Sequence, residues 1–296
     1  MNLAAGQKVV VTGAAGFLGR FLVKELSRHQ MAVIPLNLRD GWDLTRWERL
    51  KQFPLQDVSL IYHLAARIYV PNSRKKPWIF FSSNVIGTLN LLRLCRLHTV
   101  RKLVLMSTSG VYGSPRILPI NENHPLDPSD PYAISKLLAE QLCRTFFEDF
   151  GLHCIIFRAF NIYGPGQGGD LLIPKILWQL SQGRIELFDP EPKRDFLYVE
   201  DAVKALWKAG KYGGGPWEIF NLGSGKSYSV KMIVDEILRL SGKVEMPLNY
   251  VGERRSNEIM ETRADIQRVA TLLRWKPRVS LTDGLRNCLR YNNLIH

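Results

Sequence analysis

The sequence predicts an α/β fold, with a doubly wound, mostly parallel sheet followed by a smaller lobe in the C-terminal part of the chain. Short β-branched segments alternate with amphipathic segments as far as Arg158, and a glycine-rich turn separates the first such pair. Parallel strands need long crossover connections, which are usually helical and almost always right-handed. After Tyr163 the alternation breaks into short pieces rich in glycine and proline, which indicates a second, less regular part.

Local patterns predict each element of the first part. The segment 8–12 (KVVVT) reads as a strand, and the segment 17–28 reads as an amphipathic helix. The apolar residues of that helix recur at helical spacing, at Phe17, Leu18, Phe21, Leu22 and Leu26. Further strands are predicted at 31–36, 59–63, 102–107 and 154–158, and further helices at 85–97 and 133–150.

The composition argues against a membrane protein or a secreted one. The chain has 296 residues, 46% of them hydrophobic and 23% charged, and no apolar run approaches the roughly 20 residues that span a bilayer. Because no basic and apolar leader precedes the first strand, we expect a cytoplasmic protein. The cysteines are isolated from one another and from histidines, which predicts reduced thiols and no metal site: Cys95, Cys143, Cys154 and Cys288.

The net charge of +13 points to an anionic partner. Lysines and arginines are spread over the whole length in small groups, without the basic and aromatic blocks that are typical of nucleic-acid binding. A phosphate-bearing small molecule needs only about two or three of these cations. We therefore expect such a ligand, and neither a nucleic acid nor a membrane surface.

Three glycines, Gly13, Gly16 and Gly19, lie three residues apart between the first strand and the first helix. Gly13 permits a tight turn, Gly16 lets backbone approach a pyrophosphate at the positive helix end, and Gly19 allows the helix to pack closely on the sheet. Ordinary glycine turns can show the same spacing, so the interpretation depends on the strand and helix around it. In that context the pattern indicates a dinucleotide site.

Tyr132 and Lys136 are four residues apart at the start of a predicted helix, which places both side chains on one face. We expect the Lys136 ammonium to lower the pKa of the Tyr132 hydroxyl, giving a phenolate that accepts a proton near neutral pH. Ser107, Thr108 and Ser109 offer further hydroxyls at the carboxyl end of a parallel strand, where sheets of this type bind ligands. A simple surface pair is the alternative for Tyr132 and Lys136.

A series of segments resembles the extended short-chain dehydrogenase/reductase family, which contains nucleotide-sugar epimerases, dehydratases and reductases. In chain order they are TGAAGFLG (12–19), HLAA (63–66), Asn84 with Gly87 and Thr88, STSGVYG (107–113), PYAISK (131–136), RAFNIYGPG (158–166), RDFLYVEDA (194–202), FNLGSG (220–225) and WKP (275–277). The resemblance covers nearly the whole chain. It implies a Rossmann domain at 1–163 and about 194–212, and a substrate-binding lobe at about 164–193 and 213–296.

The same resemblance implies NADP or NAD as the cofactor, with hydride passing between the nicotinamide and a sugar carbon, commonly C4. It implies Tyr132 as the acid/base, Lys136 as its partner and a ribose ligand, and Thr108 as the hydroxyl that holds the reacting sugar oxygen. The implied cofactor-binding residues are Gly13, Gly16, Phe17, Leu18, Gly19, Asn37, Arg39, Asp43, Leu44, Leu64, Ala65, Ala66, Asn84, Tyr132 and Lys136.

A nucleotide-diphosphate sugar is the implied substrate. The residues that match substrate-binding positions of the family are Thr108, Asn161, Phe188, Arg194 and Arg255. Two arginines suit a diphosphate because a guanidinium pairs bidentately with phosphate oxygens. Each arginine could instead be solvated, or form a salt bridge with Asp195 or Glu258.

Departures from the family pattern narrow the reaction. Ser109 and Gly110 follow Thr108, where the 4,6-dehydratases carry the aspartate and glutamate that eliminate water. The cysteine of the GDP-fucose synthases and the acidic residue of the UDP-xylose-forming decarboxylases are missing too. The sequence therefore favours a nucleotide-sugar 4-epimerase or a 4-keto-sugar reductase. The alternatives are a dehydratase, an enzyme for another small carbonyl or alcohol, and a non-catalytic dinucleotide sensor.

Asn37 and Arg39 favour NADP over NAD. Asn37 stands where NAD enzymes usually place an aspartate that binds the ribose hydroxyls, so no charge there repels a 2′-phosphate. Arg39 could bind that phosphate or point to solvent. The segment RDGWDL (39–44) also resembles the NADP-using GDP-fucose synthases, which implies that Asp43 lies near the adenine amino group.

A homodimer is the expected assembly. The helical stretches at about 78–98 and 132–150 match those that pair across the dimer interface in the resembled family.

Overall fold

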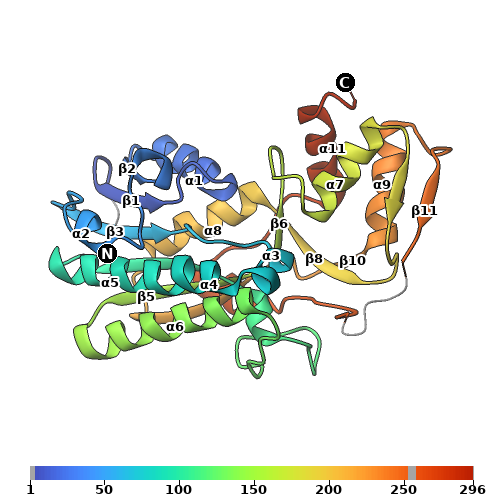
Figure 1. Ribbon diagram of the computed structural model, residues 1–296. Helices are drawn as coiled ribbons and strands as arrows, with labels where there is room; N and C mark the ends of the chain where they lie inside the picture. The colour runs from blue at the N-terminus through green and yellow to red at the C-terminus, as the bar shows by residue number, and fades with distance from the viewer. Residues whose placement is uncertain (1–3, 253–257, 296) are drawn as a thin grey trace.

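A six-stranded parallel sheet forms the centre of the molecule (Figure 1). The structure, a computed structural model, describes residues 4–252 and 258–295. The strands follow the order β2-β1-β3-β4-β5-β9, and each pairs in parallel with its neighbours. They are β1 (Lys8–Thr12), β2 (Ala32–Leu36), β3 (Val58–His63), β4 (Lys102–Thr108), β5 (His153–Ala159) and β9 (Trp217–Leu222). The predicted fold class is confirmed.

The inner strands are apolar because the sheet is covered on both faces. Successive side chains of a strand point to opposite faces, yet Val9, Val10 and Val11 are all completely buried. The order of the chain reverses between β1 and β3, which lie side by side. Open parallel sheets bind ligands beyond the carboxyl ends of their strands at such a point. The loops that follow Thr12 and His63 therefore border the expected ligand crevice.

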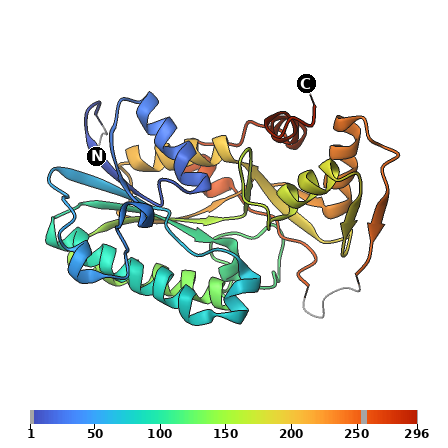
Figure 2. The same cartoon turned by 45° about the horizontal axis from the view of Figure 1, so that its top comes forward.

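Helices cover both faces of the sheet, as Figure 2 shows for α1 and α8 on one side and α5 and α6 on the other. One apolar core lies between the sheet and α1 (Phe17–Arg28), α8 (Val199–Lys211) and α10 (Gln267–Leu272). The other lies between the sheet and α2 (Trp47–Leu50), α5 (Gly87–Leu97) and α6 (Pro131–Phe150). None of the described helices combines the length and the apolar character needed to span a bilayer.

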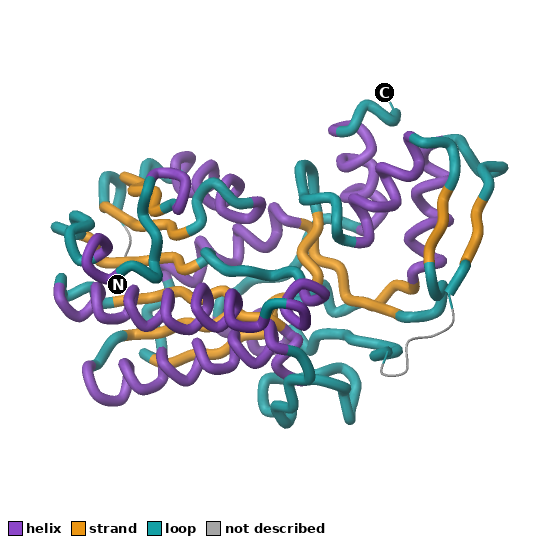
Figure 3. The backbone as a smooth tube through the Cα atoms, viewed as in Figure 1, coloured by secondary structure: helices purple, strands orange, loops and turns teal. Residues whose placement is uncertain are grey.

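A helical run precedes α5, earlier than the sequence pattern predicted. It consists of α3 (Val70–Lys75), α4 (Pro77–Phe80) and a π-helical turn, η2 (Phe81–Ile86), which leads into α5. Pro77 starts α4 because proline suits the first helical position. Two 3₁₀ turns, η1 (Leu38–Asp40) and η3 (Ser109–Tyr112), follow β2 and β4. Between η3 and α6 the chain is mainly loop, coloured teal in Figure 3.

The smaller lobe has its own apolar core. Its strands form two small sheets, one of β6 (Asn161–Tyr163), β8 (Lys193–Tyr198) and β10 (Ser227–Ser229), the other of β7 (Ile185–Leu187) and β11 (Leu248–Tyr250). Its helices are α7 (Leu172–Ser181), α9 (Val230–Ser241) and α11 (Leu281–Tyr291).

The sequence pattern divided the chain into a first part and a smaller lobe. Three elements pack with the other part than this division predicted. β9 and α10 belong to the central sheet and its cover, although 213–296 was assigned to the lobe. β8 pairs with β6 and β10, although 194–212 was assigned to the first part, and of that segment α8 packs on the central sheet. Lys102 ties α8 to β4, because its buried ammonium donates to the carbonyls of Ala209, Gly210 and Tyr212 at 2.7, 3.1 and 2.7 Å.

Candidate active site

Close backbone contacts shape the glycine-rich turn. Gly13 has φ +69°, and a Cβ atom there would lie 2.9 Å from the Ala65 nitrogen. A Cβ atom on Gly19 would lie 2.1 Å from the Gly13 carbonyl oxygen, so any larger residue would push α1 away from β1. Gly16 is the N-cap of α1, which has no side-chain cap among the described residues and no acidic residue in its first turn. The positive end of this helix is therefore suited to an anion.

A directed chain of hydrogen bonds links the ends of β1 and β3 to the start of α5. The Ala65 nitrogen donates to Thr12 Oγ1 at 3.1 Å, and Thr12 Oγ1 lies 2.8 Å from His63 Nδ1. His63 Nε2 lies 2.9 Å from Thr88 Oγ1, which itself donates to the Asn84 carbonyl at 2.6 Å. Because the Thr88 hydroxyl has one proton, His63 must donate from Nε2 and accept at Nδ1. Burial lowers the pKa of His63 to about 3, so the imidazole is neutral.

Asn84 clamps the loop that follows β3. Its side-chain oxygen accepts from the Arg67 nitrogen at 2.8 Å, and its side-chain nitrogen donates to the Arg67 carbonyl at 3.0 Å. The same nitrogen donates to Ser135 Oγ at 2.9 Å, and that hydroxyl donates to the Tyr132 carbonyl at 2.7 Å. Asn84 thus connects the loop containing Leu64, Ala65 and Ala66 to the first turn of α6.

The residues expected on the adenosine side lie beyond β2. Asn37 accepts from the Ala15 nitrogen at 2.9 Å and donates to Asp40 at 2.9 Å, so it joins the glycine turn to η1. Arg39 is exposed and has no hydrogen bond or ion pair to another described residue. Asp43 accepts from the Thr45 nitrogen and hydroxyl at 2.9 and 2.8 Å, which caps a local turn. Two of the expected cofactor residues on α1 contact the apolar core of the smaller lobe: Phe17 and Leu18. Leu44 is buried beside Gly87.

Thr108 and Tyr132 bring two hydroxyls together at the carboxyl edge of the sheet. The Tyr132 hydroxyl lies close enough to the Thr108 side chain for Thr108 to stabilise its ionised form, and Thr108 Oγ1 accepts from the Gly110 nitrogen at 3.1 Å. The Tyr132 ring packs edge-to-face on Phe80, with 6.4 Å between ring centroids. A Cβ atom on Gly110 would lie 3.3 Å from the Ala133 Cβ, so glycine allows η3 to approach α6 this closely.

The protonation of Tyr132 differs from the sequence expectation. Burial raises the pKa of Tyr132 to about 12, the Thr108 side chain opposes that rise, and the Asp130 charge adds to it. The prediction that Lys136 holds this pKa well below 10 is therefore wrong for the protein alone. The physical reason is that excluding water disfavours the phenolate more than its surroundings stabilise it.

Lys136 is 3% exposed, and its positive charge contributes to the lowered pKa of His63 on β3. Burial lowers the pKa of Lys136 to about 8, and the negative charge of Glu140 opposes that shift. Lys136 therefore loses its proton within the range in which enzymes are assayed. Tyr132 and Lys136 are not a surface pair.

The structure describes three of the four lobe residues expected at the substrate. Asn161 on β6 donates to the Asp195 carbonyl on the neighbouring β8 at 3.1 Å. Arg194 donates to the Ile259 carbonyl at 2.6 Å and forms an ion pair with Glu258, as the salt-bridge alternative foresaw. Phe188 is exposed and packs closely on Gly252. Arg255 lies outside the described residues.

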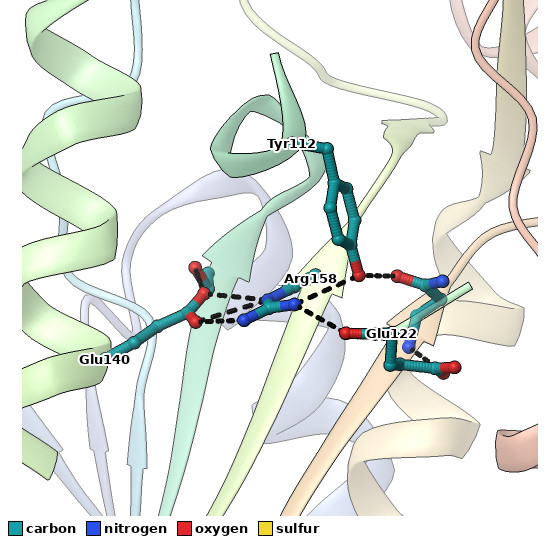
Figure 4. A network of polar contacts seen from close by, with 6 residues as sticks. Tyr112, Glu122, Glu140 and Arg158 are labelled. Atoms are coloured by element: carbon teal, nitrogen blue, oxygen red, sulfur yellow. Dashed lines mark hydrogen bonds and ion pairs between the residues drawn. The ribbon is translucent and has the colours of Figure 1, made fainter. Parts of the chain in front are cut away.

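A buried ion pair behind this site was missed by the sequence analysis (Figure 4). Arg158 and Glu140 are 3% and 2% exposed, and Arg158 Nη2 lies 2.8 Å from Glu140 Oε2. Removing one partner of such a pair costs roughly 3–5 kcal/mol, because the other charge remains buried. One signal was present in the sequence: Glu140 follows Lys136 by one helical turn.

Comparisons with known proteins agree with this geometry. The model of the NAD dependent epimerase/dehydratase family matches residues 9–223. A UDP-glucuronate 4-epimerase from Thermodesulfobacterium geofontis is 34% identical over 312 residues, covering 96% of this chain and 95% of that protein. A GDP-6-deoxy-D-mannose reductase from Pseudomonas aeruginosa is 30% identical over 294 residues, covering 96% of each. A UDP-glucose 4-epimerase from Thermotoga maritima, solved with UDP-glucose, superposes with a TM-score of 0.90 at 27% identity, covering 97% of this chain and 98% of that one.

The resemblance inferred from the sequence motifs is confirmed by these matches. Solved relatives include complexes with NAD and with NADPH, so a nicotinamide dinucleotide is common to the group. The family match spans the sheet from β1 to β9, and the relatives align over nearly the whole chain. This chain is therefore an enzyme of the NAD dependent epimerase/dehydratase family.

Proposed function

We propose that this enzyme oxidises and re-reduces C4 of a nucleoside-diphosphate sugar, acting as a 4-epimerase. The observation that carries the proposal is the placement of Thr108, at the carboxyl end of β4, close to Tyr132, which shares one face of α6 with the buried Lys136. The 4-epimerases of UDP-glucuronate and UDP-glucose among the relatives support this reaction.

The groups of this chain suit a nicotinamide dinucleotide, which when bound supplies and accepts the hydride. The glycine turn offers backbone N–H groups to the pyrophosphate, at a helix end that no side chain of the described residues caps. Ala65 and its neighbours offer backbone beside the ribose, and Lys136 offers an ammonium to the ribose hydroxyls. Asn37 and Arg39 would hold the adenosine half.

Tyr132 acts as the acid/base in this proposal. In its phenolate form Tyr132 accepts the proton of the sugar hydroxyl as the carbon is oxidised, and the hydroxyl so formed returns that proton as the carbon is reduced. Thr108 Oγ1 holds the same sugar oxygen by a hydrogen bond. Burial alone disfavours the phenolate, and in this proposal the positive charges of Lys136 and of the bound oxidised nicotinamide would together favour it. Asn161, Phe188, Arg194 and Arg255 would hold the nucleotide diphosphate, for which Glu258 must share or release Arg194.

Dehydration is disfavoured by the residues after Thr108. Water elimination needs an acid and a base of suitable pKa at the sugar, and η3 supplies Ser109 and Gly110 there. A side chain at the second position would press on Ala133 of α6. Oxidation and reduction at C4 need neither carboxylate.

The test is incubation of the purified protein with UDP-glucose, UDP-glucuronate and UDP-N-acetylglucosamine, followed by separation of the C4 epimers. Conversion of at least one substrate to its epimer is the expected result. Mass spectrometry of the denatured protein identifies any dinucleotide that copurifies. Absence of conversion with NAD or NADP added, for every sugar tried, would contradict the proposal.

A 4-keto-sugar reductase using NADPH is the second candidate, and Arg39 favours it. Arg39 is exposed next to the uncharged Asn37, so a 2′-phosphate would meet a guanidinium rather than an aspartate at that position. The Asp40 carboxylate accepts from the Asn37 side chain at 2.9 Å, so Asn37 holds this negative group in place. The GDP-6-deoxy-D-mannose reductase among the relatives is consistent with this candidate.

Arg39→Ala should weaken NADPH binding about 10- to 100-fold and change NADH binding less than about twofold, since a hydrogen bond to a charged group contributes about 1.5–3 kcal/mol. Fluorescence titration of both dinucleotides measures the difference. Arg46→Ala is the matched control, because Arg46 is also exposed but is paired with Asp43 at 3.7 Å. If Arg39→Ala weakened the binding of NADPH and NADH equally, Arg39 would have no role in the preference between the two dinucleotides.

We propose a homodimer that pairs through α5 and α6. These helices lie side by side on the outer face of the sheet (Figure 1). Large apolar side chains are exposed on them and on the run before α5: Trp78, Ile86, Leu97, Leu138 and Phe150. A second copy would bury this surface. Light scattering at micromolar concentration should give twice the 33.9 kDa chain mass, and Leu138→Glu should lower it; a chain that scatters as 33.9 kDa would contradict the proposal.

We propose a cytoplasmic location, because the cysteines of this chain are present as free thiols. All four cysteines are free and buried, as is usual for proteins of a reducing compartment.

A further inference from the structure

The ion pair of Glu140 and Arg158 is fully enclosed and geometrically specific. Arg158 Nε lies 3.3 and 3.2 Å from the two carboxylate oxygens, and Nη2 lies 2.8 Å from Oε2. The Ser107 hydroxyl donates to Glu140 Oε1. The carboxylate therefore accepts from two neighbouring strands, since Ser107 of β4 is the register partner of Arg158 of β5.

These contacts surround the groups that the proposed function uses. Ser107 immediately precedes Thr108 on β4. On the other side of Thr108, the Tyr112 hydroxyl at the end of η3 accepts from Arg158 Nη1 at 3.3 Å and donates to Asn221 at 2.7 Å (Figure 4). Glu140 itself lies one helical turn after Lys136 on α6. One buried pair thus joins three elements of the site. These are β4, which carries Thr108, the turn η3 that follows it, and α6, which carries Tyr132 and Lys136.

Besides joining these elements, Glu140 acts on Lys136 through its negative charge. Burial lowers the pKa of Lys136 to about 8, and the negative charge of Glu140, on the same helix, is the largest contribution that raises it. His63 faces Lys136 from β3, but burial lowers the pKa of His63 to about 3, so it contributes no positive charge. Tyr132 has a pKa raised to about 12 and stays neutral over the same range.

We propose that Glu140, held by Arg158 and Ser107, is a positioning residue that keeps the buried Lys136 protonated and thereby able to bind the dinucleotide ribose. The carboxylate acts through Lys136 and touches neither substrate nor dinucleotide. The inference rests on the proposed function for the role of Lys136.

Glu140→Gln tests this role because glutamine keeps the shape and removes the charge. NADPH affinity, measured by fluorescence titration from pH 6.5 to 9.5, reports the charge of Lys136 without any sugar substrate. In the wild type the affinity should fall as pH rises through about 8. In Glu140→Gln the midpoint should move down by at least about one pH unit, which gives an affinity at least about fivefold weaker at pH 8, because the protonated fraction of Lys136 falls from about one half to about one tenth. Glu140→Asp should restore part of the shift.

Glu218→Gln is the matched control. Glu218 of β9 is a mostly buried carboxylate paired with Arg268 of α10, and it is not among the groups that shift the pKa of Lys136. Its variant should keep the wild-type midpoint. If Glu140→Gln does not fold because Arg158 is left unpaired, the double variant Glu140→Gln/Arg158→Gln removes both charges. It should show a smaller downward shift, because the opposing positive charge of Arg158 is lost as well.

An unchanged midpoint in Glu140→Gln or in the double variant, with affinity altered equally at every pH, would overturn the proposal and leave Glu140 a structural residue. Failure of the proposed function has a different signature. In that case no nucleotide sugar is converted by the wild type, whereas the midpoint of NADPH binding still moves with the charge at Glu140.

Discussion

Replacing Tyr132 with phenylalanine should lower turnover of the nucleotide sugar at least about 100-fold and leave dinucleotide affinity nearly unchanged. The substitution removes the hydroxyl that exchanges a proton with the sugar, but it keeps the ring that packs on Phe80. Steady-state kinetics on the converted sugar and fluorescence titration of NADPH measure the two quantities. The split between them separates a lost acid/base from a damaged site.

The pH profile adds a second signature. Because burial raises the pKa of Tyr132 to about 12, the hydroxyl is protonated at neutral pH, and the rate of sugar oxidation should rise with pH in the wild type. In Tyr132→Phe that rise should disappear. Thr108→Val is the control, since it loses one hydrogen bond of about 1–3 kcal/mol and no proton acceptor, so its rate should fall less. A Tyr132→Phe enzyme that keeps more than about a third of its turnover would assign the proton transfer to another residue.

Replacing Lys136 with methionine should lower turnover by a similar factor and, unlike Tyr132→Phe, weaken dinucleotide binding at least about tenfold. Methionine fills much of the buried volume, so the loss reports the ammonium rather than a cavity. Binding titration and kinetics on the same preparation measure both effects.

The sign of the pH dependence follows from the depressed pKa of Lys136, which is about 8. Below that pH the ammonium is charged and binds the ribose, and above it the amine is neutral, so wild-type affinity should fall on the alkaline side. The affinity of Lys136→Met should be low and flat over the same range. Lys24→Met, which changes an exposed lysine of α1, should behave as the wild type. An alkaline fall that persists in Lys136→Met would place the titrating group elsewhere.

Local patterns in the sequence determined the elements around the site. The β-branched run 8–12 and the amphipathic run 17–28 form β1 and α1 with the predicted bounds, and the glycines lie in the turn between them. The spacing of Tyr132 and Lys136 places them on one face of α6, because four residues make about one helical turn. These features depend on residues that are close in the chain, so periodicity and turn chemistry are sufficient to find them.

Contacts between distant segments were decided by the tertiary structure alone. The sequence pattern does not show that β9 completes the central sheet, because its partner β5 is far away in the chain. Nor does it show that the isolated polar residues Arg158 and Glu140 meet.

The protonation states of Tyr132 and Lys136 were also decided by the tertiary structure. Spacing alone suggested that Lys136 would lower the pKa of Tyr132, yet in the folded protein burial raises the pKa of Tyr132 and lowers that of Lys136. The sequence by itself determined which side chains stand on one helix face and at one strand end. How much water reaches them, and which buried charges face them, depends on how β3, β4, β5 and α6 pack together, and that packing sets their charges because desolvation disfavours every ionised form.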